Sequence, residues 1–315
     1  MFYSPYTLVP CGALSARSAA QPRHGVLLRN DEGGYGCLQT WPELGDPTLD
    51  EELDAIRDGK PLRLGARALK CAMLDGEARA KKVNMFDGYT VPLSHATLPV
   101  SATPFMVHTL HQRGFRTGKL KLLPNLPATI EKLMNLAAMV PEWKWRLDFN
   151  ATLTPEGSLE FWDMLPEAMR KRIDFIEDPC PYTVESWQML QDAGLPLGYD
   201  IGSPDATCGV PCCTSKPMIR VVKPARDRTT EGVPVFTSYM DHPLGQLWAA
   251  WCAARYYHGK DPKDVPLCGL VTHHVYRMND FSEVLGAAIY PSINLPGGTG
   301  LGFDELLAAQ EWKTL

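Results

Sequence analysis

Four ionisable residues stand at the ends of short apolar runs that read as β-strands: Asp148, Glu177, Asp200 and Lys223. Successive members are separated by about one strand-plus-helix unit of a parallel α/β fold. In an eight-fold barrel, the carboxyl ends of the strands meet at one rim and supply the catalytic groups. We therefore expect these four side chains to share one pocket.

Three carboxylates in one pocket would repel each other unless a cation lay between them. Oxygen ligands suit a hard ion, so Asp148, Glu177 and Asp200 predict a Mg²⁺ site in which Mn²⁺ is a possible substitute. The chain has 36 acidic residues, so any one of these positions alone could arise by chance. Their joint placement at strand ends, with lysines in the strands before and after, favours the metal site.

Two further lysines, Lys119 and Lys121, lie in the run GKLKLL one strand earlier. Residues two apart on a strand share a face, so both ammonium groups are expected to point into the same pocket. A solvated strand edge is the ordinary alternative for such a pair. The position of the pair beside the acidic strands favours the catalytic interpretation.

Composition excludes several classes of protein. With 21% charged and 45% hydrophobic residues, the chain has the composition of a globular protein. A net charge of −5 and a pI near 5.9 argue against a nucleic-acid binder, which needs clustered basic residues. No apolar run reaches the ~18 residues of a membrane span. Residues 1–11 resemble a first strand rather than a signal peptide.

Nine scattered cysteines without a secretion signal predict reduced thiols in the cytoplasm. The cluster Cys208, Cys212 and Cys213 could hold zinc, but no fourth ligand lies at the usual spacing. The pair His273 and His274 is expected on a strand, where neighbours point to opposite faces, so at most one would face the pocket.

The organisation of the chain changes near residue 85. Residues 1–84 predict a small α+β capping domain, with strands around Val9 and at 24–30 and 35–40, and helices at 48–58 and 64–83. Residues 85–315 predict a (β/α)8-type TIM barrel whose C-terminal segment returns toward the cap, giving the chain an α/β fold. The expected barrel strands are 92–99, 119–123, 145–150, 173–176, 197–201, 219–222, 233–238 and 269–273. The expected helices are 104–114, 127–140, 158–170, 183–193, 244–257 and 304–312.

Five motifs in this order give the chain a family resemblance: KLK, RLDFN, IEDP, an aspartate in the fifth strand, and VVKP. In this respect the chain resembles the enolase superfamily, and within it the o-succinylbenzoate synthases of menaquinone biosynthesis. The resemblance spans nearly the whole chain. It implies that Asp148, Glu177 and Asp200 bind Mg²⁺, that Lys121 and Lys223 are catalytic, and that Lys119 and Asn150 are neighbouring substrate-binding positions.

The same resemblance implies a carbon–oxygen lyase, specifically a hydro-lyase. In that family, 2-succinyl-6-hydroxy-2,4-cyclohexadiene-1-carboxylate loses water to give 2-succinylbenzoate. Abstraction of the proton alpha to the carboxylate builds an enediolate, which a divalent cation would stabilise. A lysine normally titrates near ~10.4, and the Lys119 ammonium with the metal would favour a neutral Lys121, which we expect to be the base. Lys223 would stay cationic on the opposite face.

The chain also departs from the family pattern. Asp200 is followed by Ile201 and Gly202 where relatives commonly carry Glu and Ser, and Asp205 is a candidate to compensate. In the seventh strand the motif becomes FTSYMDH, which leaves Ser238 and Asp241 as expected substrate-binding residues. The loop at 12–23 is expected to close over the substrate.

The Gly-rich segment at 296–303 does not follow the GxGxxG order of a dinucleotide-binding fold. It is expected either to bind an anionic group of the substrate or to be a plain turn before the last helix.

Two other functions remain open. A dipeptide epimerase or N-acylamino acid racemase would use the same metal and lysines, with Lys121 and Lys223 acting as bases on opposite faces. A barrel without catalytic activity that serves as a binding partner is the third alternative. The expected partner in the first two cases is a small-molecule carboxylate, with no nucleic acid or membrane involved.

Overall fold

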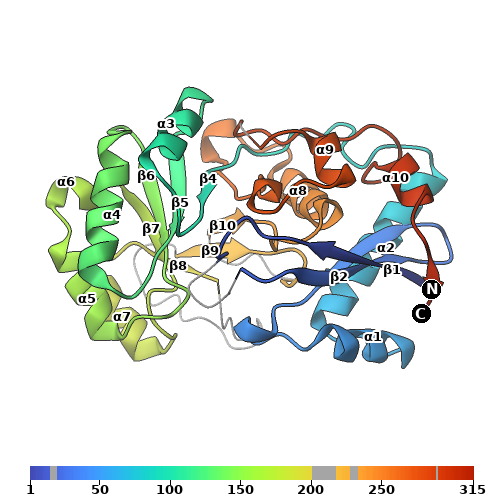
Figure 1. Cartoon of the computed structure of the whole chain (residues 1–315), viewed down its shortest axis with the longest axis horizontal. Coiled ribbons are helices and arrows are strands. Elements are labelled where there is room, and N and C mark those ends of the chain that lie inside the picture. Colours follow the sequence, from blue (N-terminus) through green and yellow to red (C-terminus); the bar gives the residue numbers. More distant parts are fainter. Residues whose placement is uncertain (15–19, 201–217, 228–232, 289) are drawn as a thin grey trace.

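The computed structural model describes residues 1–14, 20–200, 218–227, 233–288 and 290–315. An antiparallel sheet with two helices lies beside a larger parallel sheet that carries helices on its outside (Figure 1). Ile201, Gly202, Asp205 and the cysteines at 208, 212 and 213 fall outside the described residues, so the expectations for them stay predictions.

The smaller sheet is antiparallel and joins the two ends of the chain. Its strand order is β11-β1-β2-β3. The strands are β1 (Phe2–Leu8), β2 (Arg23–Arg29), β3 (Tyr35–Gln39) and β11 (Lys313–Thr314). Because β11 pairs with β1, the C-terminus lies next to the N-terminus (Figure 1). The domain boundary at residue 84 stays a prediction.

Two helices pack against this sheet, α1 (Leu49–Arg57) and α2 (Arg63–Ala80). Thr48 begins α1 with a capping box. The Thr48 hydroxyl accepts a hydrogen bond from the Glu51 backbone N–H, and the Glu51 carboxylate accepts one from the Thr48 backbone N–H. The approach of α2 requires glycine at position 34, where a Cβ would lie 2.0 Å from the Ala72 carbonyl oxygen. The sheet and α2 therefore form one tightly packed unit.

Seven parallel strands form the second sheet, in the order β10-β9-β8-β7-β6-β5-β4. They are β4 (Ala96–Leu98), β5 (Thr117–Lys121), β6 (Lys144–Asp148), β7 (Ile173–Glu177), β8 (Leu197–Tyr199), β9 (Ile219–Val222) and β10 (Val233–Phe236). The helices that follow or connect them are α3 (Pro104–Gln112), α4 (Leu126–Ala138), α5 (Pro155–Met164), α6 (Glu167–Arg170), α7 (Val184–Asp192) and α8 (Pro243–Tyr257). This alternation confirms the (β/α)8-type fold class.

The prediction of an eighth strand at 269–273 is wrong. Instead, Cys268 and Gly269 make isolated parallel bridges to Ser94 and Thr237, next to β4 and β10 respectively. These bridges connect the two edges of the sheet, so the ring is closed without a regular strand. His273 lies in a short 3₁₀ helix, η3 (His273–Val275), rather than on a strand.

The remaining short elements are η1 (Pro42–Leu44), η2 (Pro262–Asp264), α9 (Asp280–Leu285) and α10 (Asp304–Ala308). The final helix therefore ends before the residue 312 that was expected. None of the helices in the described residues has the length and apolar character needed to cross a membrane.

The helices outside the barrel sheet are held by buried apolar side chains, and α4 allows a direct test. Leu133 is completely buried in the barrel core, whereas its neighbour Met134 is 37% exposed. We expect Leu133→Ala to lower the free energy of unfolding by about 2–5 kcal/mol, because it leaves a cavity. Met134→Ala is the matched control and should change it by about 0.5 kcal/mol or less. Equal midpoints in urea unfolding would contradict this packing.

Candidate active site

The strands bring the predicted site residues to one rim. Lys121 is the last residue of β5 and lies opposite Asp148, the last residue of β6, which in turn lies opposite Glu177, the last residue of β7. Asp200 and Lys223 come one residue after β8 and β9. The prediction that these side chains stand at the carboxyl ends of successive parallel strands is therefore confirmed.

Buried ion pairs connect the lysines of β5 with the carboxylates. Lys119 Nζ donates to Glu177 Oε1 at 2.6 Å and lies 3.0 Å from Asp148 Oδ2. Lys121 Nζ donates to the same Asp148 oxygen at 2.5 Å. All four side chains are at least nine-tenths buried. One carboxylate oxygen thus has two ammonium groups beside it, in a place from which water is largely excluded.

The three carboxylates differ in what surrounds them. Burial raises the pKa of Asp148, but the charges of Lys121 and Lys119 outweigh burial and hold that pKa below its usual range. For Glu177, burial and the neighbouring Asp148 charge raise the pKa to about 8. Two adjacent carboxyl groups therefore have pKa values that are pushed apart.

The carboxylates around Lys119 favour its charged form. Burial does lower the pKa of Lys119, but Glu177, Asp148 and Asp200 together raise it above the ordinary value. The carboxylates decide the outcome because they are in contact with the ammonium group or close to it.

Asp200, which follows the strand next to that of Glu177, belongs to a second group of charges. It accepts from Lys223 Nζ and, at 2.8 Å, from the Arg226 guanidinium. Burial raises the pKa of Asp200, but Lys223 and Arg226 outweigh it and lower that pKa. Arg226 also donates to Asp227 at 3.0 Å. Asp200 is therefore held ionised and fixed in position.

The chemistry of these donors fits a hard divalent cation. They are three carboxylates from adjacent strands, and no donor among the described residues reaches the buried Glu177 Oε2. The Lys119 ammonium bridges Asp148 and Glu177, a place that suits positive charge. Within the described residues, no three acidic, histidine or cysteine side chains lie close enough together to hold one ion.

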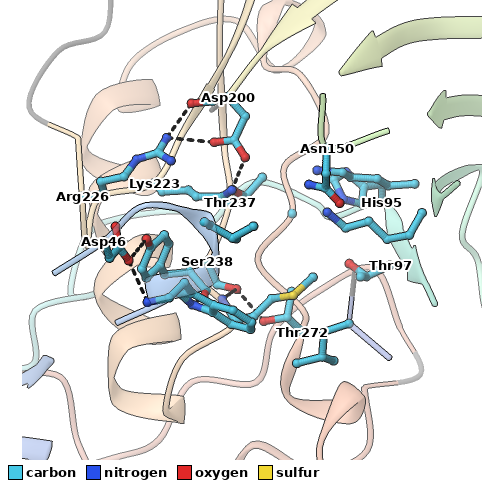
Figure 2. A pocket seen from close by; sticks show the side chains of 18 residues that line it. Asp46, His95, Thr97, Asn150, Asp200, Lys223, Arg226, Thr237, Ser238 and Thr272 are labelled. Atoms are coloured by element: carbon cyan, nitrogen blue, oxygen red, sulfur yellow. Dashed lines mark hydrogen bonds and ion pairs between the residues drawn. The ribbon is translucent and has the colours of Figure 1, made fainter. Parts of the chain in front are cut away.

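A cavity opens above these residues (Figure 2). Of the predicted site residues, Lys119, Lys121, Asn150, Asp200, Lys223 and Ser238 line it. Asp148 and Glu177 are absent from the lining and are fully buried in contact with the two lysines. In Figure 2, Asp200, Lys223 and Arg226 stand on one side of the cavity, and Asn150 and His95 stand on the other.

Asn150 and Ser238 both line the cavity. Asn150 turns the chain after β6 with φ of 50°, a conformation that asparagine tolerates, and its backbone N–H donates to Asp148 at 3.0 Å. Its side-chain oxygen is buried and has no hydrogen-bond partner in the described part of the chain. Ser238 shares a 2.6 Å hydrogen bond with Thr272 across the cavity wall.

Several lining residues were not predicted. Arg226 lies three residues after Lys223 in VVKPARD, so the sequence offered a signal for it. The N-terminal part contributes Leu14, Trp41, Leu44 and Asp46, and Asp46 accepts from the Tyr239 hydroxyl at 2.5 Å. Thr237 lies in the FTSYMDH motif next to Ser238, whereas no sequence pattern marked His95, Thr97 and Thr272.

Asp241 is not among the residues that line the cavity. Its carboxylate is buried against Gly245 at the start of α8, where a Cβ would lie 2.0 Å from Asp241 Oδ2. Its charge acts on Tyr6 and Cys37 of the N-terminal strands. We therefore leave Asp241 out of the residues proposed to bind substrate.

The position of Asp241 predicts a pH-dependent stability. Burial raises its pKa to about 7. The unfolded chain loses this proton near ~3.9, so the free energy of unfolding should fall between about pH 4 and 7, by at most about 1.4 kcal/mol per pH unit. Asp241→Asn cannot titrate and should remove this part of the dependence. Urea unfolding of both proteins at several pH values tests this prediction. If the free energy of unfolding changed with pH in the same way in the wild type and in Asp241→Asn, the prediction would be contradicted.

The expectation that the Gly-rich segment binds an anionic group of the substrate is not supported. The segment is absent from the cavity lining, and two of its amides already bind carboxylates of the chain itself. Leu301 N donates to Asp75 at 2.7 Å, and Thr299 N donates to Asp304 at 2.9 Å. Arg79 joins Asp75 and Asp304, so the segment is attached to α2.

Comparisons with known proteins agree with this geometry. Residues 1–78 match the family "O-succinylbenzoate synthase, N-terminal domain". An o-succinylbenzoate synthase of Bdellovibrio bacteriovorus is 33% identical, over 99% of this chain and 98% of its own length. An N-succinyl Arg/Lys racemase of Bacillus cereus has a similar fold, with a TM-score of 0.75 and 15% identity. The match covers 99% of this chain and 98% of the racemase. A dipeptide epimerase of Enterococcus faecalis, complexed with Mg and L-Leu-L-Tyr, gives a TM-score of 0.71, 15% identity and coverage of 95% and 97%.

Proposed function

Because the chain belongs to the o-succinylbenzoate synthase family of the enolase superfamily, we propose that it dehydrates 2-succinyl-6-hydroxy-2,4-cyclohexadiene-1-carboxylate to 2-succinylbenzoate in a Mg²⁺-dependent reaction. This would make it a carbon–oxygen lyase. The arrangement of the ionisable side chains is the structural observation that supports this proposal. The rim places an amine, Lys121, in register with two carboxylates on the next two strands, and Asp200 with Lys223 lies across the same cavity.

We assign the metal to Asp148, Glu177 and Asp200, with Mn²⁺ as a substitute. When bound, the divalent cation would neutralise the negative charge that develops on the substrate carboxylate. The Lys119 ammonium shows where positive charge is already favoured, since it contacts two of these carboxylates. Release of Lys119 from them would leave its side chain free to turn toward the substrate.

Lys121 acts as the base in this proposal. Its neutral amine takes the proton from the carbon next to the carboxylate, so that the C–H bond breaks, an N–H bond forms and an enediolate results. In a syn elimination, the same ammonium then gives its proton to the departing hydroxide. The C–O bond breaks, water leaves and the ring becomes aromatic. One side chain thus serves both steps.

Lys223 faces the reaction from the other wall. Lys121 lies on β5 and Lys223 follows β9, and these strands are four positions apart in the sheet. In a ring closed through Cys268 and Gly269, they are on opposite sides. A cationic Lys223 can therefore stabilise the developing charge from the face opposite Lys121. Asn150 and Ser238, together with Lys119, are the proposed substrate contacts.

The direct test of this function is an assay with the cyclohexadiene substrate and Mg²⁺. We expect an aromatic ultraviolet absorption to appear, and we expect EDTA to prevent it. A folded protein that binds Mg²⁺ and leaves this substrate unchanged would contradict the proposed reaction.

The six cysteines in the described residues are all free thiols, which is consistent with the further proposal that the enzyme works in the cytoplasm.

A racemase or epimerase is the second candidate, and the opposed lysines favour it specifically. Both faces of one substrate carbon would then meet an amine, as inversion of configuration requires. Incubation of a dipeptide or an N-acylamino acid in D₂O separates the two functions. Deuterium incorporation at the alpha carbon with loss of configuration supports the racemase, and retention of the original proton excludes it for that substrate.

A further inference from the structure

The floor of the cavity carries polar side chains that the proposed reaction does not use. Thr97 lies opposite Lys119 in the sheet, so His95, two residues earlier on the same face, lies one layer deeper in the barrel. Thr237, one residue after β10, also lines the cavity. Both pack on Gly269, where a Cβ would lie 2.7 Å from Thr237 Cγ2 and 3.0 Å from His95 Nε2. Glycine at 269 therefore leaves room for both side chains.

Arg146 determines which nitrogen of His95 carries hydrogen. Arg146 Nη1 lies 2.9 Å from His95 Nδ1. A guanidinium has donors only, so Nδ1 must accept, and the hydrogen of the neutral ring is on Nε2. Arg146 is itself held by Asp174 at 2.7 Å and by the Leu267 carbonyl at 2.7 Å. The imidazole thus presents a fixed N–H donor to the cavity.

The surroundings of His95 keep the ring neutral and favour an anion beside it. Burial lowers the pKa of His95 well below its usual range, and the charges of Arg146, Lys119 and Lys121 lower it further. Those same three cations act on the ring, and each of them is also paired with a carboxylate of the chain. A carboxylate oxygen is the group that such a place attracts.

Two polar atoms on this floor are without partners. The hydroxyl of Thr237 is buried and has no hydrogen-bond partner within the described ranges. The only hydrogen bond that His95 makes there is the one through Nδ1 to Arg146, which leaves Nε2 unused. Buried polar groups are rarely left unpaired, so an oxygen from a bound molecule is expected at the Thr237 hydroxyl, and Nε2 adds a second polar atom to the same floor.

We propose that His95 Nε2–H and the Thr237 hydroxyl form a subsite that binds a second carboxylate of the substrate, distinct from the carboxylate next to the reacting carbon. The inference rests on the proposed function, since both 2-succinylbenzoate and its precursor carry such a group at the end of the succinyl chain. His95 and Thr237 thereby become determinants of substrate specificity, and Arg146 becomes a residue that positions His95.

Two ligands that differ only at the end of this chain test the subsite. Calorimetry with Mg²⁺ would compare 2-succinylbenzoate with 2-butanoylbenzoate, which has a methyl group in place of the second carboxylate. The wild type should prefer the succinyl compound by about tenfold or more. Thr237→Val and His95→Asn should reduce this preference, whereas His95→Gln, which can place an amide N–H near the position of Nε2, should keep part of it.

The outcomes separate the subsite from the function. If the variants lowered the affinity for both ligands equally, or if the wild type bound both ligands equally well, the subsite alone would be overturned. A wild type that binds neither ligand would contradict the proposed function and the subsite with it. ¹⁵N NMR of the ligand-free protein adds an independent test, because it should show the hydrogen of His95 on Nε2. In Arg146→Met, the hydrogen should be distributed between Nε2 and Nδ1. A proton on Nδ1 in the wild type would overturn the proposal.

Discussion

Replacing Lys121 with alanine is expected to lower kcat on the order of 10⁴-fold, the upper range for removal of a general base. Lys121 ends β5 in register with Asp148 and lines the cavity, so we propose that its amine takes and returns the proton. Asp148 keeps Lys119 as a neighbour at 3.0 Å, so the buried carboxylate is not left without a counter-charge. The fold and the affinity for Mg²⁺ should therefore survive the substitution.

The controls for Lys121→Ala are the Mg²⁺ affinity and a surface lysine. Lys171 is 73% exposed and makes a solvated ion pair with Glu167. Lys171→Ala should leave kcat unchanged. If Lys121→Ala keeps a tenth or more of the wild-type turnover, the assignment of the base is wrong. If it loses Mg²⁺ affinity to the same extent as turnover, Lys121 acts on the metal site rather than on the proton.

Glu177→Gln has the second largest expected effect, a loss of Mg²⁺ affinity of roughly 100-fold or more together with loss of turnover. The substitution keeps the shape of the side chain but replaces one charged oxygen ligand by an amide, which hard cations bind less well. In the wild type, Mg²⁺ at a hundred times its Kd should stabilise the fold by about 2.7 kcal/mol. In Glu177→Gln, added Mg²⁺ at this concentration should hardly change the unfolding midpoint.

Thermal unfolding with and without Mg²⁺ measures this difference. Glu185→Gln, on the exposed first turn of α7, is the matched control and should respond to Mg²⁺ as the wild type does. An equal shift in the midpoint of all three proteins would show that the ion binds elsewhere on the chain.

The placement of the charged residues could be predicted from sequence because each one ends an apolar run. Asp148, Glu177 and Lys121 are the final residues of strands whose inner positions are buried, and parallel strands bring such ends to one rim. Helices such as α4 and α7 were also predictable, since each begins at a capping residue, Asn125 and Thr183.

Other features depend on contacts that no local pattern encodes. The ring closes through single bridges at Cys268 and Gly269, which are too short to give the alternation of a strand. The pKa of Lys119 follows from three carboxylates on other strands rather than from the lysine two residues away. His95 and Thr237 are uncharged and isolated in sequence, and their importance appears only where β4, β10 and Gly269 meet.

The central claim is that one divalent cation gathers Asp148, Glu177 and Asp200 between amines on opposite walls. A crystal of the protein soaked in Mn²⁺, measured for anomalous scattering, tests this claim most directly. We predict one strong peak at roughly 2.0–2.3 Å from an oxygen of each of the three carboxylates, with Lys119 turned away from them. A peak at another position, or carboxylates still bridged by Lys119 in saturating Mn²⁺, would contradict the account.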